Sequence, residues 1–377
     1  MVPEAPRLTV IVPAFNEAIR LSEGAALLEE AVGNGSLCPE ETELIFVDDG
    51  STDETGWRAE ELLASRFPLL RVLRLHDNAG KGAAIRLGTA AATAPVVLFM
   101  DADMSVDPSQ IPHLVKAIGP ADVAIGSRSL NESVVECDNM HRRVMGWTFN
   151  IVVSSLTKMP FRDTQCGFKA MRTPLARVLF HLMQVKRFAF DVELLSLARQ
   201  LQMEIAEIAV HWCEVGDSRV RAFADSVEMA RDVLHVRSRR EWPHLPALVV
   251  TPAPGERRRS QSRAFGDIHR SLGPNFPILS LSEDQSMVLL PLCDPLEVQT
   301  IADRLRMLPT KLTVRERSLS FPQLMERTPF RWIDGESGGL VVGLQSGVSE
   351  LTIRAPVGGW ETVRSRGGGT NEVSLNA

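Results

Sequence analysis

The chain has no tyrosine and only five cysteines among its 377 residues. The cysteines are Cys38, Cys137, Cys166, Cys213 and Cys293, and no two of them form a CxxC pair. Such scattered cysteines are typical of reduced thiols and argue against a disulfide scaffold or a zinc site. We therefore expect a cytoplasmic protein. We have no physical account of the missing tyrosine.

Long apolar segments are also missing. The N-terminal sequence MVPEAPRLTVIVPAF lacks a basic stretch followed by a long apolar one, so no signal peptide is expected. Apolar runs such as Val96–Met100 and Ile151–Leu156 are far shorter than the roughly 20 residues of a spanning helix. Any contact with a membrane is therefore expected to be peripheral.

The chain has no excess of positive charge, since its formal net charge is −6. This balance gives no general electrostatic reason to bind nucleic acid, which we exclude as a partner. Hydrophobic residues make up 44% of the chain and charged residues 23%, which is typical of soluble globular proteins. The length exceeds that of most single domains and favours two.

Short β-branched runs alternate with helical stretches in the first half of the chain. The expected strands are LTVIVPA, ELIFVDDG, LRVLRL and PVVLFMDAD, and the expected helices cover residues 19–32, 53–67 and 81–92. This alternation predicts an α/β fold with a mostly parallel sheet covered by helices. Each run ends in polar residues, which the topology should gather on one rim of the sheet.

A Pro-, Gly-, Ser- and Arg-rich stretch, PAPGERRRSQS, interrupts this pattern near residue 252. Such composition is typical of an exposed linker. We predict an α/β domain over residues 1–244, a linker over 245–262, a small α+β domain over 263–362 and a disordered tail over 363–377.

Two carboxylates follow the apolar strand PVVLF, at Asp101 and Asp103. Hard divalent cations such as Mg²⁺ or Mn²⁺ prefer such oxygen ligands and neutralise a diphosphate leaving group. The alternative for an isolated Asp-Ala-Asp sequence is a solvated turn, because aspartate is common in turns.

The sequences VIVPAFNE and IFVDDGSTDET precede this site at the spacing of successive βα units. With the Asp-Ala-Asp site they resemble inverting glycosyltransferases of family 2, which have the GT-A fold, over residues 7–235. The resemblance implies that Asp101 and Asp103 hold the metal. It also implies a nucleotide-binding set formed by Pro13, Asn16, Glu17, Asp48, Asp49 and Asp101. The alternative for Asp48 and Asp49 is a helix N-cap cluster.

A Gly-Lys-Gly turn precedes a helix within NAGKGAAIRLG. Free N–H groups and Lys81 at such a position can meet a phosphate of the nucleotide-sugar. The alternative is helix capping beside an exposed lysine.

Further segments extend the resemblance to the group that contains dolichyl-phosphate glucosyltransferases and bacterial polyprenyl-phosphate glycosyltransferases. These segments are GSRS, RDTQCGFKAMR, RFAFDVELL and VHWCEVGDSRV. The implied reaction transfers a hexose, glucose in this group, from UDP to a lipid phosphate. The implied acceptor-phosphate residues are Arg128 with Arg142 or Arg143, since arginine bonds two phosphate oxygens at once.

The acceptor determines what catalysis requires. A phosphate monoester is already anionic and needs no strong base, whereas a hydroxyl acceptor needs a carboxylate, for which we nominate Asp163. A soluble or glycan hydroxyl acceptor is therefore the first alternative function. A nucleotide-sugar-binding protein without turnover and a nucleotidyltransferase are the others.

The segment from His141 to Leu156 begins with Arg142 and Arg143 and continues with an apolar body. A helix of this composition can lie in the headgroup region of an anionic membrane. The alternative is a core helix of the first domain.

Overall fold

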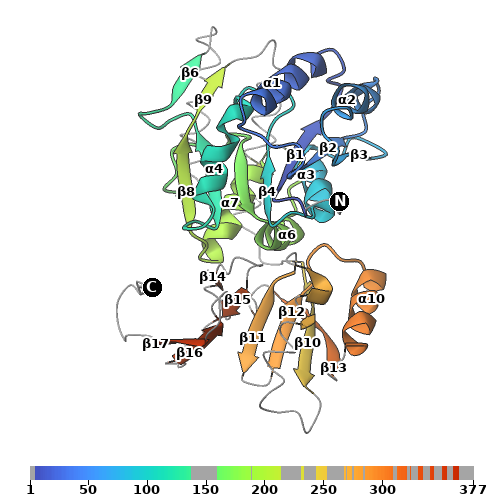
Figure 1. Cartoon of the computed structure of the whole chain (residues 1–377), viewed down its shortest axis with the longest axis vertical. Helices are drawn as coiled ribbons and strands as arrows, with labels where there is room; N and C mark the ends of the chain where they lie inside the picture. The colour runs from blue at the N-terminus through green and yellow to red at the C-terminus, as the bar shows by residue number, and fades with distance from the viewer. Residues whose placement is uncertain are drawn as a thin grey trace. The chain divides into compact units, whose positions relative to one another are not determined.

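The computed structural model divides the chain into two compact units, Met1–Leu245 and Pro246–Ala377 (Figure 1). The described residues are 5–136, 159–187, 189–213, 231–232, 243–252, 267–268, 270–273, 276–282, 285–308, 312–320, 323, 330–333, 340–343, 350–354 and 360–364. Each unit is considered by itself.

The first unit is built on a seven-stranded sheet in the order β3-β2-β1-β4-β7-β5-β8. Its strands are β1 (Leu8–Ala14), β2 (Thr42–Asp48), β3 (Leu70–Arg74), β4 (Val96–Phe99), β5 (Val123–Ser127), β7 (Lys169–Arg172) and β8 (Ile205–Ala209). All neighbouring pairs are parallel except those of β7, which runs antiparallel between β4 and β5. The predicted α/β fold with a mostly parallel sheet is confirmed.

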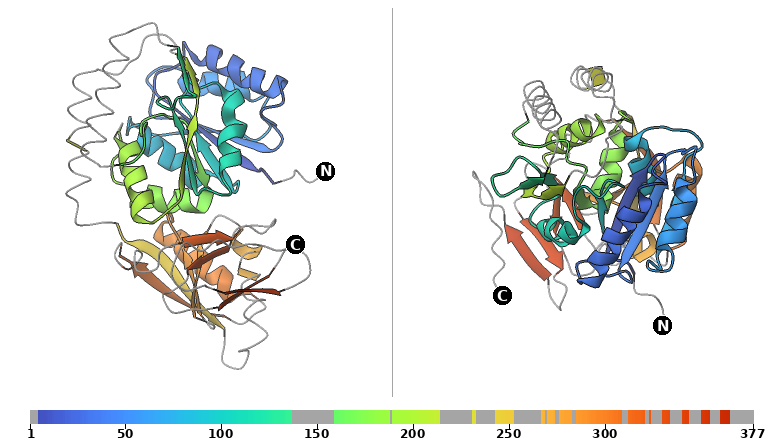
Figure 2. Two further views of the ribbon diagram at one scale, coloured as in Figure 1. Left: turned by 90° about the vertical axis from the view of Figure 1, so that its left-hand side faces the viewer. Right: turned by 90° about the horizontal axis from the view of Figure 1, so that it is seen from above.

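Helices cover both faces of this sheet (Figure 2). They are α1 (Leu21–Gly33), α2 (Thr55–Leu63), α3 (Lys81–Ala91), the 3₁₀ helix η1 (Pro108–Gln110), α4 (Ile111–Ala117), α6 (Thr173–Leu182) and α7 (Phe190–Gln200). Val10 and Val12 of β1 pack in the core cluster shared with α1 and α2, whereas Ile11 lies against α3 at Gly88. Since successive strand residues face opposite sides and both sides are covered, all of β1 is buried, and its residues are apolar except Thr9, whose hydroxyl donates to Glu43.

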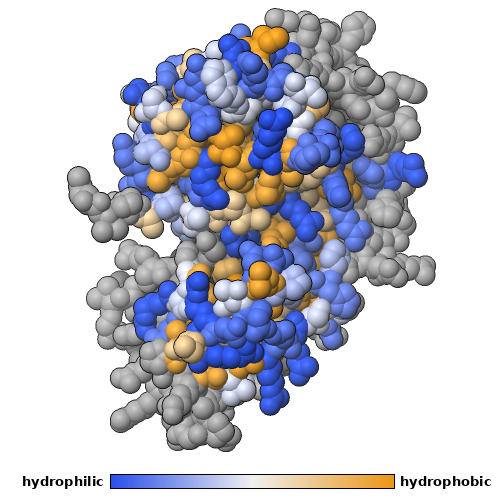
Figure 3. Space-filling view, turned by 90° about the vertical axis from the view of Figure 1, so that its right-hand side faces the viewer, coloured by the Kyte–Doolittle hydropathy of each residue, from blue (hydrophilic) through white to orange (hydrophobic). Residues whose placement is uncertain are grey.

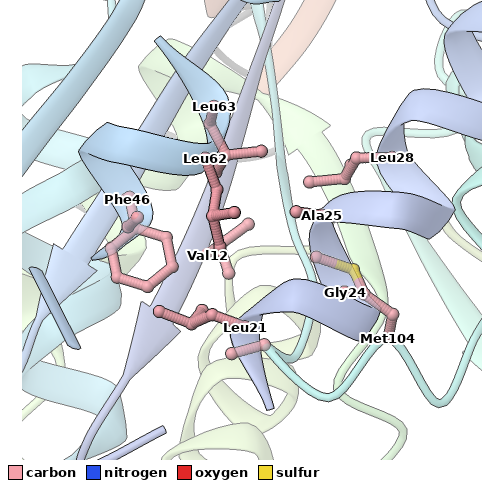
Figure 4. Close-up of a pocket in the computed structure, with 11 residues that line it drawn as sticks. Val12, Leu21, Gly24, Ala25, Leu28, Phe46, Leu62, Leu63 and Met104 are labelled. Atoms are coloured by element: carbon pink, nitrogen blue, oxygen red, sulfur yellow. The ribbon is translucent and has the colours of Figure 1, made fainter. Parts of the chain in front are cut away.

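A small gap remains in the core between α1, α2 and the sheet (Figure 4). Val12, Leu21, Leu28, Phe46 and Met104 are among the apolar side chains that line it. Its volume of about 10 Å³ is at the lower limit for holding a single water molecule. This gap is a packing defect and not a ligand site.

Apolar side chains also reach the surface of the first unit (Figure 3). Ile19, in the connection between β1 and α1, is 81% exposed, and Trp57 in α2 is 61% exposed. Scattered exposure of this kind is ordinary for a folded protein. Among the described residues, no helix combines the length and apolarity needed to span a bilayer.

A second, short parallel pair lies beside the main sheet. β6 (Val134–Glu136) pairs with β9 (His211–Cys213), with Glu136 opposite Cys213. The backbone N–H of Cys213 donates to the carbonyl oxygen of Ser105 at 2.8 Å, which attaches β9 to the loop after β4.

The second unit contains a four-stranded sheet in the order β11-β12-β10-β13 and one long helix. The elements are β10 (Leu245–Pro252), β11 (Ile278–Ser282), β12 (Gln285–Leu289), α10 (Pro295–Arg306) and β13 (Leu312–Leu319). A capping box between Asp294 and Glu297 begins α10. Two hairpins complete the described part, β14 (Phe330–Ile333) with β15 (Leu340–Gly343), and β16 (Glu350–Arg354) with β17 (Trp360–Arg364).

The predicted linker over residues 245–262 is wrong in its first eight residues, which form β10. The linker was inferred from the composition of residues 252–262, whereas Leu245, Ala247 and Leu248 are apolar and fully buried in the structure. Burial of these side chains favours a strand over an exposed connection. The predicted tail over 363–377 lies outside the described residues, apart from its first two.

The tight turn after β2 requires a glycine at position 50. Its φ of +70° is a conformation that other residues rarely adopt, and a Cβ atom there would lie 2.7 Å from the backbone nitrogen of Asn78. We expect Gly50→Ala to destabilise the first unit by about 3 kcal/mol or more. The matched control is Gly35→Ala, where φ is +77° but no atom lies within 4 Å of the added carbon. Gly35→Ala should lower the free energy of unfolding by only about 1–2 kcal/mol. Equal urea midpoints for the two variants would contradict the steric argument.

Candidate active site

The carboxyl ends of the parallel strands meet on one rim of the sheet, where ligands bind in open α/β folds. Asp49 follows β2, Asp101 lies just beyond β4 and Arg128 follows β5. Because β7 runs antiparallel, its first residue, Lys169, pairs with Phe99 at the end of β4. The loop that precedes β7 therefore reaches the same rim.

The Asp-Ala-Asp turn is oriented by the apolar residues between and after its carboxylates. Ala102 and Met104 are 7% and 5% exposed and belong to the core cluster that includes α1. Met104 has a positive φ of 51°, which turns the chain sharply. With Ala102 and Met104 anchored in the core, Asp101 and Asp103 are left on the side of the rim.

Lys81, the first residue of α3, forms an ion pair with Asp101. Burial lowers the pKa of Lys81, but the negative charges of Asp101 and Asp191 outweigh burial and raise it. Lys81 is therefore a firmly charged ammonium group beside the first carboxylate. The contact of Lys81 with a phosphate of the nucleotide-sugar stays a prediction.

Asp103 accepts a hydrogen bond from the backbone N–H of Ser105 at 3.1 Å. Burial, followed by the negative charge of Asp101, raises the pKa of the Asp103 carboxyl. Two neighbouring carboxylates therefore disfavour each other's charge, which is the situation that a bound cation relieves.

A buried ion pair lies behind Asp101. Lys169 is completely buried, bonds to the carboxylate of Asp191 and donates to the carbonyl oxygen of Cys166 at 2.7 Å. Burial raises the pKa of Asp191, although the charges of Lys169 and Lys81 oppose this effect. Asp191 therefore supports the site from behind, through its ion pair with Lys169.

The resulting group contains three carboxylates and two ammonium groups: Asp101, Asp103 and Asp191 with Lys81 and Lys169. Gly167 approaches so closely that an added Cβ atom would lie 2.6 Å from Oδ1 of Asp101. One uncompensated negative charge and two rim carboxylates fit a hard divalent cation such as Mg²⁺ or Mn²⁺. Asp101 and Asp103 are the residues that would hold it.

Arg128 and Asp163 form a two-point ion pair on the other side of the rim. Nε and a terminal nitrogen of Arg128 donate to the two carboxylate oxygens of Asp163 at 2.7 and 3.0 Å. The backbone N–H of Arg128 adds a third bond at 3.0 Å. Burial opposes ionisation, but Arg128 lowers the pKa of Asp163 to about 2. Arg128 also lies 5.9 Å from the ring centre of Trp212.

The residues predicted at the end of β1 connect it to the turn after β2. Asn16 has a φ of +55°, and its side-chain oxygen accepts from the backbone N–H of Thr52 at 2.8 Å. The backbone N–H of Glu17 donates to the hydroxyl of Thr55 at 2.8 Å. Pro13 is buried within β1. These bonds hold two strand ends together; nucleotide binding by Pro13, Asn16 and Glu17 stays a prediction.

The paired aspartates after β2 are both buried. Asp48 accepts from the backbone N–H of Ser51 at 2.8 Å and lies 3.5 Å from Nε of Arg74. The Asp49 carboxylate accepts from the backbone N–H groups of Ala79 and Gly80 at 2.8 and 2.9 Å. Asp49 thus positions the loop that carries Lys81. The predicted contacts of Asp48 and Asp49 with nucleotide lack a supporting observation.

The structure brings Lys81, Asp101 and Asp103 together and pairs Arg128 with Asp163. Arg142 and Arg143 lie outside the described residues, as does most of the segment from His141 to Leu156. Lys169, Asp191 and Gly167 lie in the sequence segments that carry the family resemblance, but the sequence alone does not show what they contact, because their partners lie far along the chain.

Comparisons with known proteins identify the family of this chain. The family model described as Glycosyl transferase family 2 matches residues 9–179. The dolichyl-phosphate β-glucosyltransferase of Dictyostelium discoideum is 34% identical over 248 residues, which cover 62% of this chain and 74% of that protein. The corresponding Drosophila melanogaster protein is 36% identical, and the match covers 61% of this chain and 74% of that protein. The Homo sapiens protein is 34% identical, and the match covers 62% of this chain and 75% of that protein.

Among solved structures, glucosyl-3-phosphoglycerate synthase from Mycobacterium tuberculosis with Mn²⁺ and UDP-glucose aligns with a TM-score of 0.46. Its sequence identity is 18%, and the alignment covers 62% of this chain and 78% of that one.

A parallel α/β sheet with an Asp-Ala-Asp rim, together with these relatives, defines an enzyme that transfers glycosyl groups. The chain belongs to glycosyl transferase family 2. The resemblance found in its sequence motifs is confirmed.

The ion pair of Asp163 should make stability depend on pH. A carboxyl whose pKa falls from 3.8 to about 2 on folding stabilises the protein fully above the unfolded value. That contribution, on the order of 2 kcal/mol, is lost as pH falls from about 4 towards 2. We therefore expect Asp163→Asn to lower stability at pH 7 and to differ less from wild type at pH 3.

Urea unfolding at both pH values measures this difference, and Asp77→Asn on an exposed loop is the control. The same Asp163→Asn deficit at pH 3 and pH 7 would show that the ion pair is not its source.

Proposed function

We propose that the protein is an inverting glucosyltransferase that transfers glucose from UDP-glucose to a polyprenyl phosphate of the dolichyl type. Support comes from relatives at 31–36% identity that carry the name dolichyl-phosphate β-glucosyltransferase. The observation that carries the choice of acceptor is the Arg128–Asp163 pair.

Donor binding is assigned to the rim beside β4. Asp101 and Asp103 hold Mg²⁺ or Mn²⁺, which when bound supplies positive charge to the departing diphosphate. Lys81 contributes a second positive charge next to Asp101. Asp49 keeps Lys81 in place through Ala79 and Gly80, so it acts on the donor through the loop.

The acceptor follows from the ionisation of Asp163. A general base works best when its pKa lies near the operating pH, whereas the pKa of Asp163 is about 2. Both of its oxygens already accept bonds from Arg128. Asp163 is therefore a poor base for activating a hydroxyl. This supports an acceptor that is already ionised, namely a phosphate, over a glycan or other hydroxyl acceptor.

Arg128 is the residue assigned to that phosphate. Asp163 and the Trp212 ring hold its guanidinium group in one orientation, and about a third of its side chain is exposed. A pre-oriented guanidinium loses little freedom when it binds a planar pair of oxygens. Arg142 and Arg143 are proposed to add to this phosphate site. They are also proposed to make a peripheral contact with the cytoplasmic face of the membrane.

The metal assignment predicts the behaviour of Asp103→Asn. This change removes an anionic ligand from the rim without disturbing the core, so we expect turnover to fall by 100-fold or more, in the range for loss of a key electrostatic contact. The assay measures UDP released from UDP-glucose with Mn²⁺ or Mg²⁺ and polyprenyl phosphate. Asp107→Asn, at an exposed helix cap, is the matched control. Near-normal turnover by Asp103→Asn, or by wild type in EDTA, would refute the metal assignment.

The acceptor assignment predicts a selective effect of Arg128→Lys. Lysine keeps the positive charge but cannot bond two oxygens in one plane. We expect KM for polyprenyl phosphate to rise by about tenfold, equivalent to about 1.4 kcal/mol, with unchanged affinity for UDP. Calorimetry with UDP separates the two effects. Detergent-free turnover with a polar hydroxyl acceptor, unaffected by this change, would support the alternative function.

A further inference from the structure

The short β6–β9 pair carries three side chains with metal-binding atoms at one place on the surface. Nε2 of His211 lies 2.9 Å from Oε1 of Glu136. Sγ of Cys213 lies 3.3 Å from Oε2 of Glu136 and 3.6 Å from Nε2 of His211. None of these residues belongs to the donor or acceptor site described above.

Strand geometry explains how the three groups come together. His211 and Cys213 are two residues apart on β9 and therefore face the same side. Glu136 is the register partner of Cys213 across the parallel pair. The intervening Trp212 faces the other way, towards Arg128. The three side chains thus occupy the face of β9 opposite the active-site contact.

Their spacing fits one tetrahedral cation. Zinc bonds of about 2.3 Å to sulfur and 2.0–2.2 Å to nitrogen and oxygen place tetrahedral ligands about 3.3–3.6 Å apart. The separations of Cys213 from its two partners already match this range. The His211–Glu136 separation needs to widen by only a few tenths of an ångström, which side chains at the surface allow.

The ligand types select the kind of cation. Thiolate and imidazole favour zinc and related transition metals, whereas Mg²⁺ prefers a shell of oxygens. The sequence argued against a zinc site because it contains no CxxC pair, but here the ligands come from two strands 75 residues apart.

We propose that Glu136, His211 and Cys213 form a binding site for a zinc-type divalent cation, made of different residues from the Asp101–Asp103 site. Three protein ligands leave one tetrahedral position for water. A parallel pair of three residues per strand is marginal by itself. The cation ties β6 to β9 at their last residues and stabilises the position of Trp212.

Cobalt spectroscopy tests this site on the full chain. Co²⁺ bound to a thiolate gives a charge-transfer band in the near ultraviolet, which carboxylate ligands do not produce. The metal-free, reduced protein is first saturated with Mg²⁺, which occupies oxygen sites but competes poorly for sulfur and nitrogen. We expect the band to saturate at one Co²⁺ per chain and to disappear when Zn²⁺ is added.

Two variants and two matched controls locate the band. Cys213→Ser should abolish it, and His211→Gln should weaken Co²⁺ affinity by at least the roughly 10–100-fold that smaller changes around metal ligands cost. Cys38→Ser and His76→Gln should leave it unchanged. Cys38 also bonds to a glutamate and His76 to an aspartate, but neither lies in a three-ligand group of described residues.

A stability measurement provides the second readout. Glu136 and His211 are exposed and Cys213 is half-buried, so the variants should fold, which circular dichroism checks. Zn²⁺ should raise the melting temperature of wild type in the presence of Mg²⁺ but not that of His211→Gln, because only a ligand of the folded state stabilises it. An absent band in wild type, or a band retained by Cys213→Ser, would overturn the proposal. Either result leaves the glucosyltransferase assignment untouched, since that rests on other residues.

Discussion

The active-site rim depends on how the negative charge of Asp101 is compensated. Lys81 pairs with this carboxylate directly, and Lys169 pairs with Asp191 in the fully buried layer behind it. A buried ion pair contributes little net stability, but removing one partner leaves an uncompensated charge. The arrangement therefore constrains both helices that supply these residues, α3 through Lys81 and α7 through Asp191.

The reversed strand β7 makes this arrangement possible. An additional parallel strand would deliver its following loop to the rim, whereas β7 delivers the loop that precedes it. That loop contains Asp163, which orients Arg128, and Gly167, which lies against Asp101. One inserted antiparallel strand thus joins the proposed acceptor side of the rim to the proposed metal side, through the segment from Asp163 to Gly167.

The local pattern of apolar and polar residues in the sequence predicted those parts of the fold that depend on residues close together in the chain. The alternation of β-branched and helical runs indicated the parallel sheet, and polar residues at strand ends indicated the rim with Asp101 and Asp103. Pairings between distant residues were not predictable in this way. Arg128 and Asp163 are 35 positions apart, and Lys169 and Asp191 are 22 apart, so no periodicity links them. The four-residue β7 is likewise too short to show a strand period, and β10 was hidden beside a linker-like composition.

Strand β9 connects the two halves of the site physically. Its Trp212 lies against Arg128, while the backbone N–H of Cys213 bonds to Ser105, whose own N–H donates to Asp103. A displacement of β9 therefore moves a support of the proposed acceptor arginine, Arg128, together with a support of the proposed metal ligand, Asp103. Because β9 pairs with β6 over only three residues, the sheet itself provides little resistance to such a displacement. A cation bound across Glu136, His211 and Cys213 would add a further link between β6 and β9, on the face of β9 opposite the contact of Trp212 with Arg128.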